Sequence, residues 1–346
     1  MIKVLVVDDS PLIRALLTEV LQLANDIQVI GSAEDPFDAR EKIKTLNPDV
    51  LTLDIEMPKM DGISFLKNLM RLRPMPVVMI STLTQQGAPA TLESLELGAI
   101  DFIAKPTKNV AQELRDYTDI LHDKIRAAAG ARVRPFLPLK ENKHAKIANP
   151  ETVRFKANHL SVIGASTGGT EAIKEVLTRL PAHFPAVVIT QHIPPVFSTS
   201  FSERMDRTSA MTVKEPKDGE IIETGTVYIA PGDYHLSIKR KGSDLVCYLS
   251  QSEPVNRHRP AVDVLFDSVA KLGLKSLSAC ILTGMGADGA KGLLKLKEAG
   301  AKTFVQDEKS CVVFGMPKAA FELGAASKQV PLEQVADVLM RLAIKR

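Results

Sequence analysis

The sequence predicts two α/β domains joined by a linker, for three reasons. Its 346 residues favour two domains at roughly 150 residues each. Short apolar runs alternate with amphipathic helical patterns before residue 125 and again after residue 158, which is typical of parallel sheets covered by helices. Residues 126–157 interrupt this alternation with a basic, proline-containing stretch.

Residues 1–125 predict a doubly wound α/β domain. Continuous apolar runs of the kind found in strands buried on both faces lie at residues 3–7, 27–33, 49–54, 76–81 and 101–105. Amphipathic helical patterns separate these runs. The first of them has Ser10 as a capping residue and Pro11 in the first turn, and apolar side chains then recur on one helical face.

Residues 126–157 predict a basic linker that contains prolines, in "RPFLPL" and "ANPE". A flexible segment of about 25 residues spans about 25–30 Å, which would let the two domains dock face to face. Its positive charge either contacts an acidic partner or serves solubility alone, and the sequence favours neither explanation.

Residues 158–346 predict a second α/β domain with an antiparallel insertion. Strand-like runs lie at residues 160–165, 186–191, 278–284 and 302–307, and a helical pattern follows each. Residues 234–250 alternate on both sides of "KGSD", which predicts a β-hairpin.

Composition excludes several classes of function. A net charge of +3, no Trp and 5% aromatic residues argue against a nucleic-acid partner. No apolar stretch approaches the roughly 20 residues of a spanning helix, so we expect no membrane insertion. The three cysteines, Cys247, Cys280 and Cys311, lack metal-ligand spacing, and we expect them to be buried in a cytoplasmic protein.

Polar residues end several strands of the first domain. Asp8 and Asp9 end the first predicted strand, Asp54 ends the third, and Ser81 and Lys105 end the fourth and fifth. In a sheet of order 2-1-3-4-5 the first and third strands are neighbours, and their carboxyl ends flank the position where ligands bind. Three carboxylates repel one another unless a cation lies between them, and oxygen ligands suit Mg²⁺.

This ordered set, together with "VDDS", "DIEMPKMDG" and "KP", resembles the receiver domain of bacterial response regulators over about residues 2–125. The resemblance implies a flavodoxin-like fold, and it implies that Asp54 accepts a phosphoryl group from a histidine kinase. Asp8, Asp9 and Asp54 would hold Mg²⁺, and the backbone carbonyl of Glu56 would complete the site.

The same resemblance assigns roles to three further residues. Ser81 and Lys105 would sense the phosphoryl group, and Phe102 occupies the position of the family's aromatic switch residue. A metal ion beside Asp54 would also keep its carboxylate deprotonated as a nucleophile.

The second half contains "VIGASTGGTEA", in which Gly164, Ser166 and Gly168 fit the pattern G-x-S-x-G between a strand and a helix. This context fits a nucleophile on a sharp turn. It fits equally a glycine-rich loop whose N–H groups bind an anion at a helix N-terminus, and a tight turn without further role is nearly as plausible.

A nucleophile needs a general base, and His192 follows a strand directly and therefore lies at its carboxyl end. His258, in the polar segment "NRHRP", is its rival. We expect His183, in a turn, and His159, before a strand, to be solvated.

The base in turn needs a carboxylate that orients it. Asp288 follows a buried strand in the glycine-rich segment "LTGMGADGA", and Asp263 and Asp307 are its rivals. The chain order Ser, His, Asp matches none of the usual hydrolase orders, but triads are recognised by geometry rather than by order.

Five segments of residues 158–346 form a recognisable set: "IGASTGGTEA", "VVITQHIPP", "PVNRHRPAVDVLF", "ILTGMGADGA" and "SCVVFGMP". Through them this half closely resembles the catalytic domain of the chemotaxis protein-glutamate methylesterases, a Rossmann-like α/β domain. The family's nucleophile falls on Ser166, its base on His192 and its aspartate on Asp288. Thr167 and Met285 fall where the family lines the site, with the Met285 N–H as a candidate oxyanion donor.

One departure from the family lies next to this set, because Ala287 stands where the family often has Asn. The departure leaves Asp288 in place and affects only its fine positioning.

The two resemblances together imply a phosphorylation-activated hydrolase. It would remove methyl groups from glutamate γ-methyl esters of chemoreceptors and deamidate receptor glutamines, without a cofactor in the catalytic domain. The unphosphorylated receiver would cover the Ser166 cleft, and we expect a monomer. The alternative is a response regulator whose α/β output domain only binds a ligand. A DNA-binding output is disfavoured because the second half is not a small helix-turn-helix.

Overall fold

The structure, a computed structural model, describes residues 1–82, 87–105, 111–133 and 153–345. The chain divides into two compact units, Met1–Lys140 and Glu141–Arg346. Most of the predicted linker, residues 134–152, and the proline of the "KP" motif lie outside the described residues.

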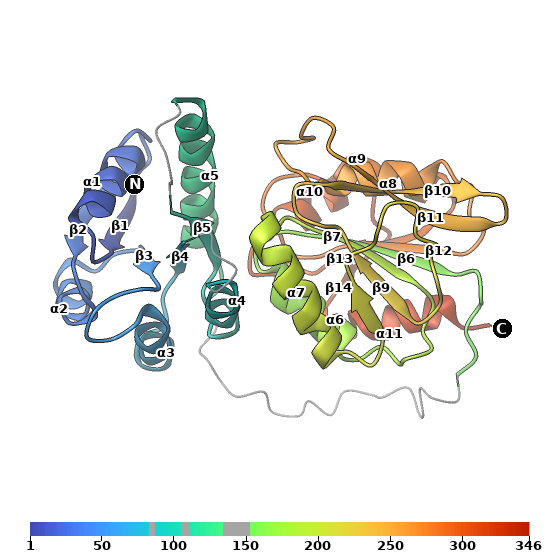
Figure 1. The fold of residues 1–346 in the computed structure, drawn as a ribbon, viewed down its shortest axis with the longest axis horizontal. Coiled ribbons are helices and arrows are strands. Elements are labelled where there is room, and N and C mark those ends of the chain that lie inside the picture. Colours follow the sequence, from blue (N-terminus) through green and yellow to red (C-terminus); the bar gives the residue numbers. More distant parts are fainter. Residues whose placement is uncertain (83–86, 106–110, 134–152, 346) are drawn as a thin grey trace. The chain divides into compact units, whose positions relative to one another are not determined.

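The first unit contains one sheet of five parallel strands in the order β2-β1-β3-β4-β5 (Figure 1). The strands are β1 (Ile2–Val7), β2 (Ile27–Ala33), β3 (Val50–Asp54), β4 (Val77–Ser81) and β5 (Asp101–Ala104). The helices are α1 (Pro11–Gln22), α2 (Pro36–Leu46), α3 (Gly62–Leu72), α4 (Ala88–Glu96) and α5 (Ala111–Ala129). The predicted strands and the predicted sheet order are confirmed.

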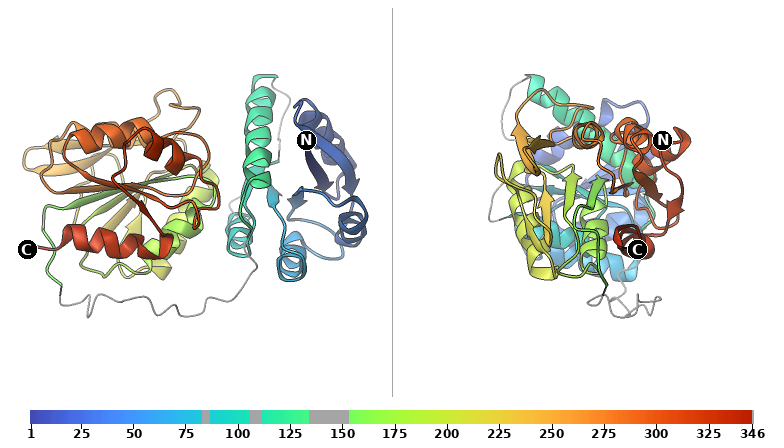
Figure 2. Two further views of the ribbon diagram at one scale, coloured as in Figure 1. Left: turned by 180° about the vertical axis from the view of Figure 1, so that it is seen from behind. Right: turned by 90° about the vertical axis from the view of Figure 1, so that its right-hand side faces the viewer.

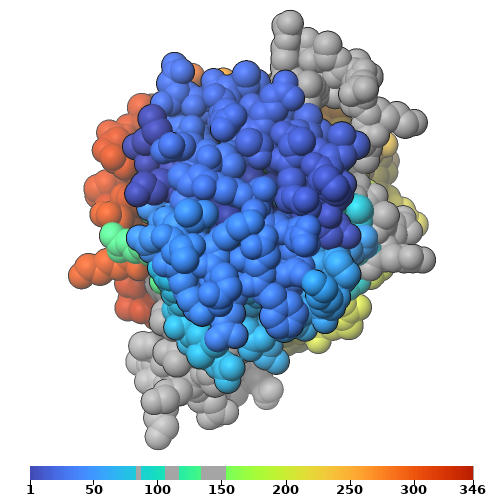
Figure 3. Space-filling view, turned by 90° about the vertical axis from the view of Figure 1, so that its left-hand side faces the viewer, coloured from blue at the N-terminus to red at the C-terminus, as the bar shows by residue number. Residues whose placement is uncertain are grey.

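Helices cover both faces of this sheet. In Figure 1, α1 and α5 lie above it, and α2, α3 and α4 lie below it. Side-chain caps fix three helix starts: Ser10 accepts a hydrogen bond from the Ile13 N–H, and Asp35 and Asp61 cap α2 and α3 in the same way. Blue, N-terminal segments form the face of this unit that Figure 3 shows.

The second unit contains a seven-stranded parallel sheet of order β14-β13-β12-β6-β7-β9-β8 and a separate antiparallel hairpin, β10-β11. The sheet strands are β6 (Leu160–Ala165), β7 (Val187–Gln191), β8 (Thr212–Lys214), β9 (Thr226–Ile229), β12 (Leu277–Ile281), β13 (Lys302–Gln306) and β14 (Gln329–Val330). The hairpin strands are β10 (His235–Lys241) and β11 (Asp244–Ser250). The predicted fold class is confirmed, hairpin included.

Helices cover both faces of this sheet as well. They are α6 (Gly169–Leu177), α7 (Pro195–Thr208), α8 (Val262–Ala270), α9 (Ala290–Glu298), α10 (Met316–Glu322) and α11 (Leu332–Ala343). Figure 1 shows α8, α9, α10 and the hairpin on one face and α6, α7 and α11 on the other, and Figure 2 shows the same layers from behind. Polar residues follow the strands of both sheets at their carboxyl ends, so the candidate sites lie at these ends.

Two sequence expectations differ from the structure. β8, β9 and β14 were not expected, because strands of two to four residues give too short a pattern to recognise. His159 was expected to be solvated but is buried, with 4% of its surface exposed. Its ring nitrogens contact the hydroxyls of Ser276 and Ser278 at 2.8 and 3.0 Å, and these contacts replace the water that the sequence suggested.

Candidate functional site

Ser166 lies on a sharp turn between β6 and α6. Its N–H donates to the Thr283 carbonyl at 3.0 Å, and its own carbonyl accepts from the Gly169 N–H at 2.6 Å. Gly168 caps the helix with φ +74°, a conformation that favours glycine. A Cβ on Gly284 would lie 2.8 Å from the Ser166 Cβ, so only glycine lets the β12 loop approach the serine this closely.

His192 joins Ser166 to Asp288. It directly follows β7, and its N–H donates to the Ala165 carbonyl at 3.1 Å. Its Nδ1 lies 3.1 Å from the Ser166 Oγ, and its Nε2 lies 2.8 Å from the Asp288 Oδ2. Because a carboxylate only accepts hydrogen bonds, Nε2 carries the proton and Nδ1 presents its lone pair to the serine hydroxyl.

Asp288 is held by the first turn of α8. Its Oδ2 accepts from the Val262 N–H at 2.6 Å, and its Oδ1 accepts from the Asp263 N–H at 3.2 Å. Burial by itself would raise the pKa of Asp288, but the hydrogen bonds from His192, Asn256 and Val262 outweigh burial and lower it. The carboxylate is therefore ionised wherever its histidine partner can act as a base.

The structure also places the residues that the sequence offered as alternatives for the general base and for its carboxylate partner. The His258 ring stacks on the His192 ring, with centroids 3.6 Å apart and planes 16° apart, so it covers the histidine rather than the serine. Asp263 accepts from the Gly292 N–H at 2.7 Å. Asp307 accepts from the Ser310 N–H at 3.1 Å. His183 is exposed, as expected.

Thr167 follows the serine in the chain, and Met285 follows Gly284, where a Cβ would lie 2.8 Å from the Ser166 Cβ. Thr167 is buried, and its carbonyl accepts from the Thr283 hydroxyl at 3.0 Å. Met285 is half-buried. Ala287, the departure from the family, is exposed, so this small side chain leaves Asp288 in its contacts.

Sequence reasoning missed Asn256, which donates to the Asp288 Oδ1 at 2.7 Å. The signal was available, since Asn256 lies two residues before His258 in the segment "NRHRP" that was singled out for the histidine. The residue was missed because only the fold brings that loop to Asp288.

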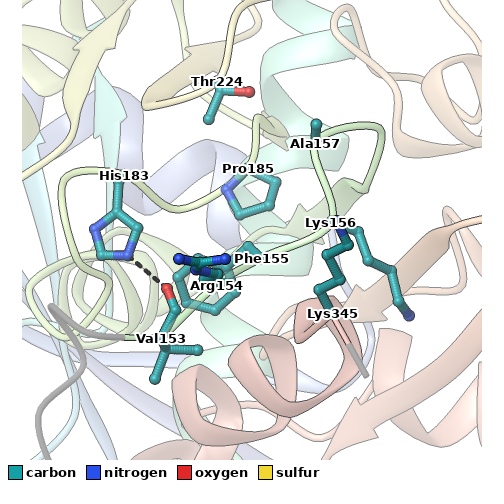
Figure 4. A pocket seen from close by; sticks show the side chains of 9 residues that line it. All are labelled: Val153, Arg154, Phe155, Lys156, Ala157, His183, Pro185, Thr224 and Lys345. Atoms are coloured by element: carbon teal, nitrogen blue, oxygen red, sulfur yellow. Dashed lines mark hydrogen bonds between the residues drawn. The ribbon is translucent and has the colours of Figure 1, made fainter.

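A pocket of about 510 Å³ lies elsewhere in this unit (Figure 4). Residues 153–157, His183, Pro185, Thr224 and Lys345 line it, and the His183 Nε2 lies 3.0 Å from the Val153 carbonyl (Figure 4). None of the three residues of the serine site lines it. The pocket therefore has no direct connection to the chemistry of Ser166.

The first unit brings its predicted acids together. Oxygen atoms of Asp8, Asp9 and Asp54 lie within 4.8 Å of one another. The Lys105 Nζ lies 3.0 Å from the Asp8 Oδ2 and 2.8 Å from the Asp54 Oδ2. One ammonium thus faces two buried carboxylates, with a third, exposed one beside them.

This imbalance of charge appears in the pKa values. Burial raises the pKa of Asp54 to about 6, and although Lys105 opposes the rise, the neighbouring Asp8 charge adds to it. Burial would lower the pKa of Lys105, but the Asp54 and Asp8 carboxylates outweigh burial and raise it. The cluster therefore gains from a further cation, and its hard oxygen donors fit Mg²⁺.

The remaining predicted residues of this unit lie in or just after the strands β3, β4 and β5. Ser81 is buried at the end of β4, and its Oγ lies 2.8 Å from the Thr91 Oγ1 of α4. Phe102 is buried in β5, and the Lys124 Nζ lies 5.7 Å from its ring centroid. Glu56 is exposed just after β3, where its backbone N–H hydrogen bonds Asp54.

Among the described residues, no helix is both long enough and apolar enough to cross a membrane.

Comparison with known proteins gives matches over both units. The sequence model of the CheB methylesterase family matches residues 161–339, and that of the response regulator receiver domain matches residues 4–117. A protein-glutamate methylesterase/protein-glutamine glutaminase of Cupriavidus pinatubonensis is 53% identical, with 99% of this chain and 96% of that protein covered. One from Nitrosomonas europaea is also 53% identical, at the same coverage.

A solved structure agrees with the second unit. The crystal structure of the Thermotoga maritima CheB methylesterase catalytic domain is 43% identical with a TM-score of 0.52, and covers 54% of this chain and 100% of that one. The matches to both family models and the full-length relatives point the same way. The chain belongs to the CheB family, methylesterases with an N-terminal receiver domain.

Proposed function

We propose that this chain hydrolyses glutamate γ-methyl esters of chemoreceptors and deamidates receptor glutamines, with Ser166 as nucleophile, His192 as general base and Asp288 as the carboxylate that orients the base. The observation that carries the proposal is the pair of contacts on His192, 3.1 Å to the Ser166 Oγ and 2.8 Å to the Asp288 Oδ2. The names of the full-length relatives supply protein glutamate methyl esters and protein glutamines as the substrate class, and the family resemblance supplies chemoreceptors as the proteins that carry them.

The first step transfers an acyl group to the enzyme. His192 Nδ1 takes the proton of the Ser166 hydroxyl as Oγ attacks the ester carbonyl carbon, and Asp288 stabilises the imidazolium that forms. His192 then returns the proton to the leaving oxygen, and methanol departs. A glutamyl-serine ester remains on Ser166.

The second step releases the acid. His192 takes a proton from a water molecule, which attacks the ester carbonyl, and the proton passes to Ser166 Oγ as the glutamate carboxylate leaves. A glutamine side chain follows the same steps with ammonia as leaving group. An amide is less reactive than an ester, so deamidation is slower.

Donors beside the serine stabilise the negative oxygen of each tetrahedral intermediate. We assign this role to the Met285 N–H, with Thr167 lining the same position. Within the described residues the Met285 N–H donates to no other group, whereas the neighbouring Gly284 N–H is used by the Val313 carbonyl at 3.1 Å.

The receiver supplies the switch. We propose that the Asp54 carboxylate attacks the phosphorus of a phosphohistidine on a histidine kinase, and that the P–N bond breaks as the imidazole leaves. Asp8, Asp9, Asp54 and the Glu56 carbonyl would hold Mg²⁺, and Ser81, Lys105 and Phe102 would respond to the phosphoryl group. The ion would neutralise charge between the carboxylates and phosphoryl oxygens. The Lys105 ammonium, already on Asp54, would follow the new charge.

The proposed domain limits follow from the same assignment: receiver 1–125, linker 126–157 and methylesterase domain 158–346. We propose that the unphosphorylated receiver inhibits the esterase site, and that phosphorylation of Asp54 shifts the population towards an active form. The protein acts as a cytoplasmic monomer on receptor helices, with no nucleic-acid partner, no membrane insertion and no cofactor in its catalytic domain.

The test is methanol release from methyl-labelled receptor membranes by the full chain, with and without Mg²⁺ and a small phosphodonor, beside Ser166→Ala. Release that rises with the phosphodonor and falls on the order of 10⁴–10⁶-fold in Ser166→Ala supports the proposal. Absence of release from the wild-type chain under every condition would leave a binding domain instead.

A further inference from the structure

A tight turn next to His192 and Asp288 plays no part in the mechanism so far. The turn spans Val255–His258, and its end residues exchange two backbone hydrogen bonds, at 3.1 and 2.9 Å. Both central residues have positive φ, +52° at Asn256 and +66° at Arg257. Positive φ at both positions is the pattern of a type I′ turn, which Asn tolerates at its first central position.

The segment around this turn is anchored. The Arg259 guanidinium donates to the Asp233 Oδ1 at 2.6 and 2.9 Å and to the carbonyl oxygens of Gln251 and Ser252. The buried His235 accepts from the Ala261 N–H through Nδ1 at 3.2 Å and contacts the Glu253 carbonyl through Nε2. A turn in a strained conformation persists when its surroundings fix it, and such turns cluster at functional sites.

Asn256 lies between two carboxylates. Its Nδ2 donates to the Asp288 Oδ1 at 2.7 Å and to the Asp263 Oδ2 at 2.9 Å. Both neighbours only accept hydrogen bonds, so the amide nitrogen, not the oxygen, must face them. The amide therefore gives both carboxylates a shared donor and fixes the oxygen of Asp288 that His192 does not use.

His258 lies on the other side of the same pair. Its ring lies 3.6 Å above the His192 ring and nearly parallel to it. Parallel stacking restricts rotation of His192 about its Cβ–Cγ bond, on which the simultaneous contacts of Nδ1 and Nε2 depend.

We propose that the turn Val255–His258 is a positioning element of the esterase site: Asn256 fixes Asp288, and His258 fixes the ring plane of His192. Neither side chain takes part in bond making or breaking. The inference rests on the proposed function, because it assigns positions to groups whose chemistry is proposed above. It adds two residues that determine rate without contacting substrate.

The first test replaces Asn256 by Gly, which keeps the left-handed backbone and removes only the amide. We expect kcat for methanol release to fall about 10–100-fold with KM nearly unchanged. The matched control is Asn47→Gly, the same change at another left-handed asparagine (φ 48°), in the receiver unit. This control should keep wild-type kcat, and thermal unfolding checks that both variants fold.

The second variant, Asn256→Asp, keeps the shape and replaces the shared donor by a third carboxylate. If the amide acts by donating to Asp288 and Asp263, the aspartate is more harmful than glycine, although it is the closer isostere. A kcat for Asn256→Asp above that of Asn256→Gly would overturn this part of the inference.

The third test compares His258→Ala with His258→Phe. A flat ring that only stacks should restore most of the activity that alanine loses, whereas a phenylalanine variant as impaired as alanine would contradict the stacking role.

Ser166→Ala, assayed in parallel, distinguishes a failure of the proposed function from a failure of the positioning role. Activity that survives in Ser166→Ala refutes the proposed function. A dead Ser166→Ala beside fully active Asn256→Gly and His258→Ala variants refutes only the positioning role.

Discussion

Each unit places an aspartate at the carboxyl-end side of its parallel sheet, and the two aspartates have opposite environments. Asp54 ends β3, and Asp288 follows β12, so both lie at the carboxyl ends of parallel strands, where ligands bind in such sheets. Burial raises the pKa of Asp54 to about 6, whereas the pKa of Asp288 is lowered. The difference lies in the donors that each carboxylate receives.

Asp288 is fully supplied by its own domain. His192, Asn256 and two N–H groups of the first turn of α8 all donate to it. A helix N-terminus also favours negative charge. Such a carboxylate needs no ligand to remain ionised, which suits a group whose proposed task is to hold an imidazole in one orientation through every turnover.

Asp54 is supplied incompletely. It shares Lys105 with Asp8, and Asp9 adds a third negative group. An added cation therefore stabilises a buried carboxylate that has too few positively charged partners. An aspartate at the carboxyl end of a parallel sheet thus either stays ionised without a ligand or depends on an added cation. The number of hydrogen-bond donors that the fold provides decides between the two.

The largest effect that we expect comes from Asp288→Asn. An amide presents a donor as well as an acceptor to His192, so the imidazole no longer holds its proton on Nε2, and kcat should fall about 10⁴-fold with KM little changed. Methanol release measures it. Asp263→Asn is the matched control, because Asp263 forms no hydrogen bond with His192 among the described residues, and this variant should lose far less activity. Equal losses in the two variants would remove the distinction drawn between the two aspartates.

Mg²⁺ should stabilise the receiver and leave the esterase domain unaffected. At a concentration 100 times its Kd, a ligand of the native state adds about 2.7 kcal/mol to the free energy of unfolding. Thermal unfolding with Mg²⁺ and after chelation measures the gain. Asp9→Asn should lose it, and Glu19→Gln, which removes an exposed acid of α1, should keep it. A gain that Asp9→Asn retains would place the ion elsewhere.

Asp54→Asn should abolish the response to a phosphodonor without reducing basal methanol release. Coupling between two sites is typically 1–3 kcal/mol, so the wild-type chain should be stimulated about 5–150-fold and the variant not at all. The ratio of rates with and without the phosphodonor is the measurement. If the phosphodonor still stimulates Asp54→Asn, a carboxylate other than Asp54 accepts the phosphoryl group.

Much of this comparison could be predicted from the sequence, and the rest could not, for physical reasons. Buried parallel strands give continuous apolar runs, so the polar residues that end them, Asp54 and His192 among them, stand out. Residue patterns alone left Asp263 as a rival of Asp288, and the family resemblance selected Asp288, because the donors that distinguish Asp288 come from α8 and from a distant turn. His159 and Asn256 were misjudged or missed for the same reason, since their partners lie far away in the chain.

The smallest effect concerns His159, a third buried titratable group, whose partners are neutral hydroxyls. Burial lowers its pKa from 6.5 to about 4, and the Lys156 charge adds to the shift. The unfolded chain therefore binds a proton near pH 6.5 that the folded chain binds only near pH 4, so stability is lost as pH falls through this range. The loss should reach about 1–2 kcal/mol at pH 5 relative to pH 8, as measured by urea unfolding.

His159→Gln isolates this contribution, because an amide can keep hydrogen bonds to Ser276 and Ser278 but does not titrate. The variant should lose less stability than the wild-type chain between pH 8 and pH 5, while His183→Gln, which changes an exposed histidine, should behave like the wild type. If the stability of His159→Gln falls as steeply with pH as that of the wild type, the buried imidazole is not the group that takes up a proton on unfolding. The neutral hydroxyls of Ser276 and Ser278 would then stabilise a buried imidazolium as well as charged partners do. The number and charge of the surrounding hydrogen-bond partners would therefore determine the pKa of Asp54 and Asp288 but not that of His159.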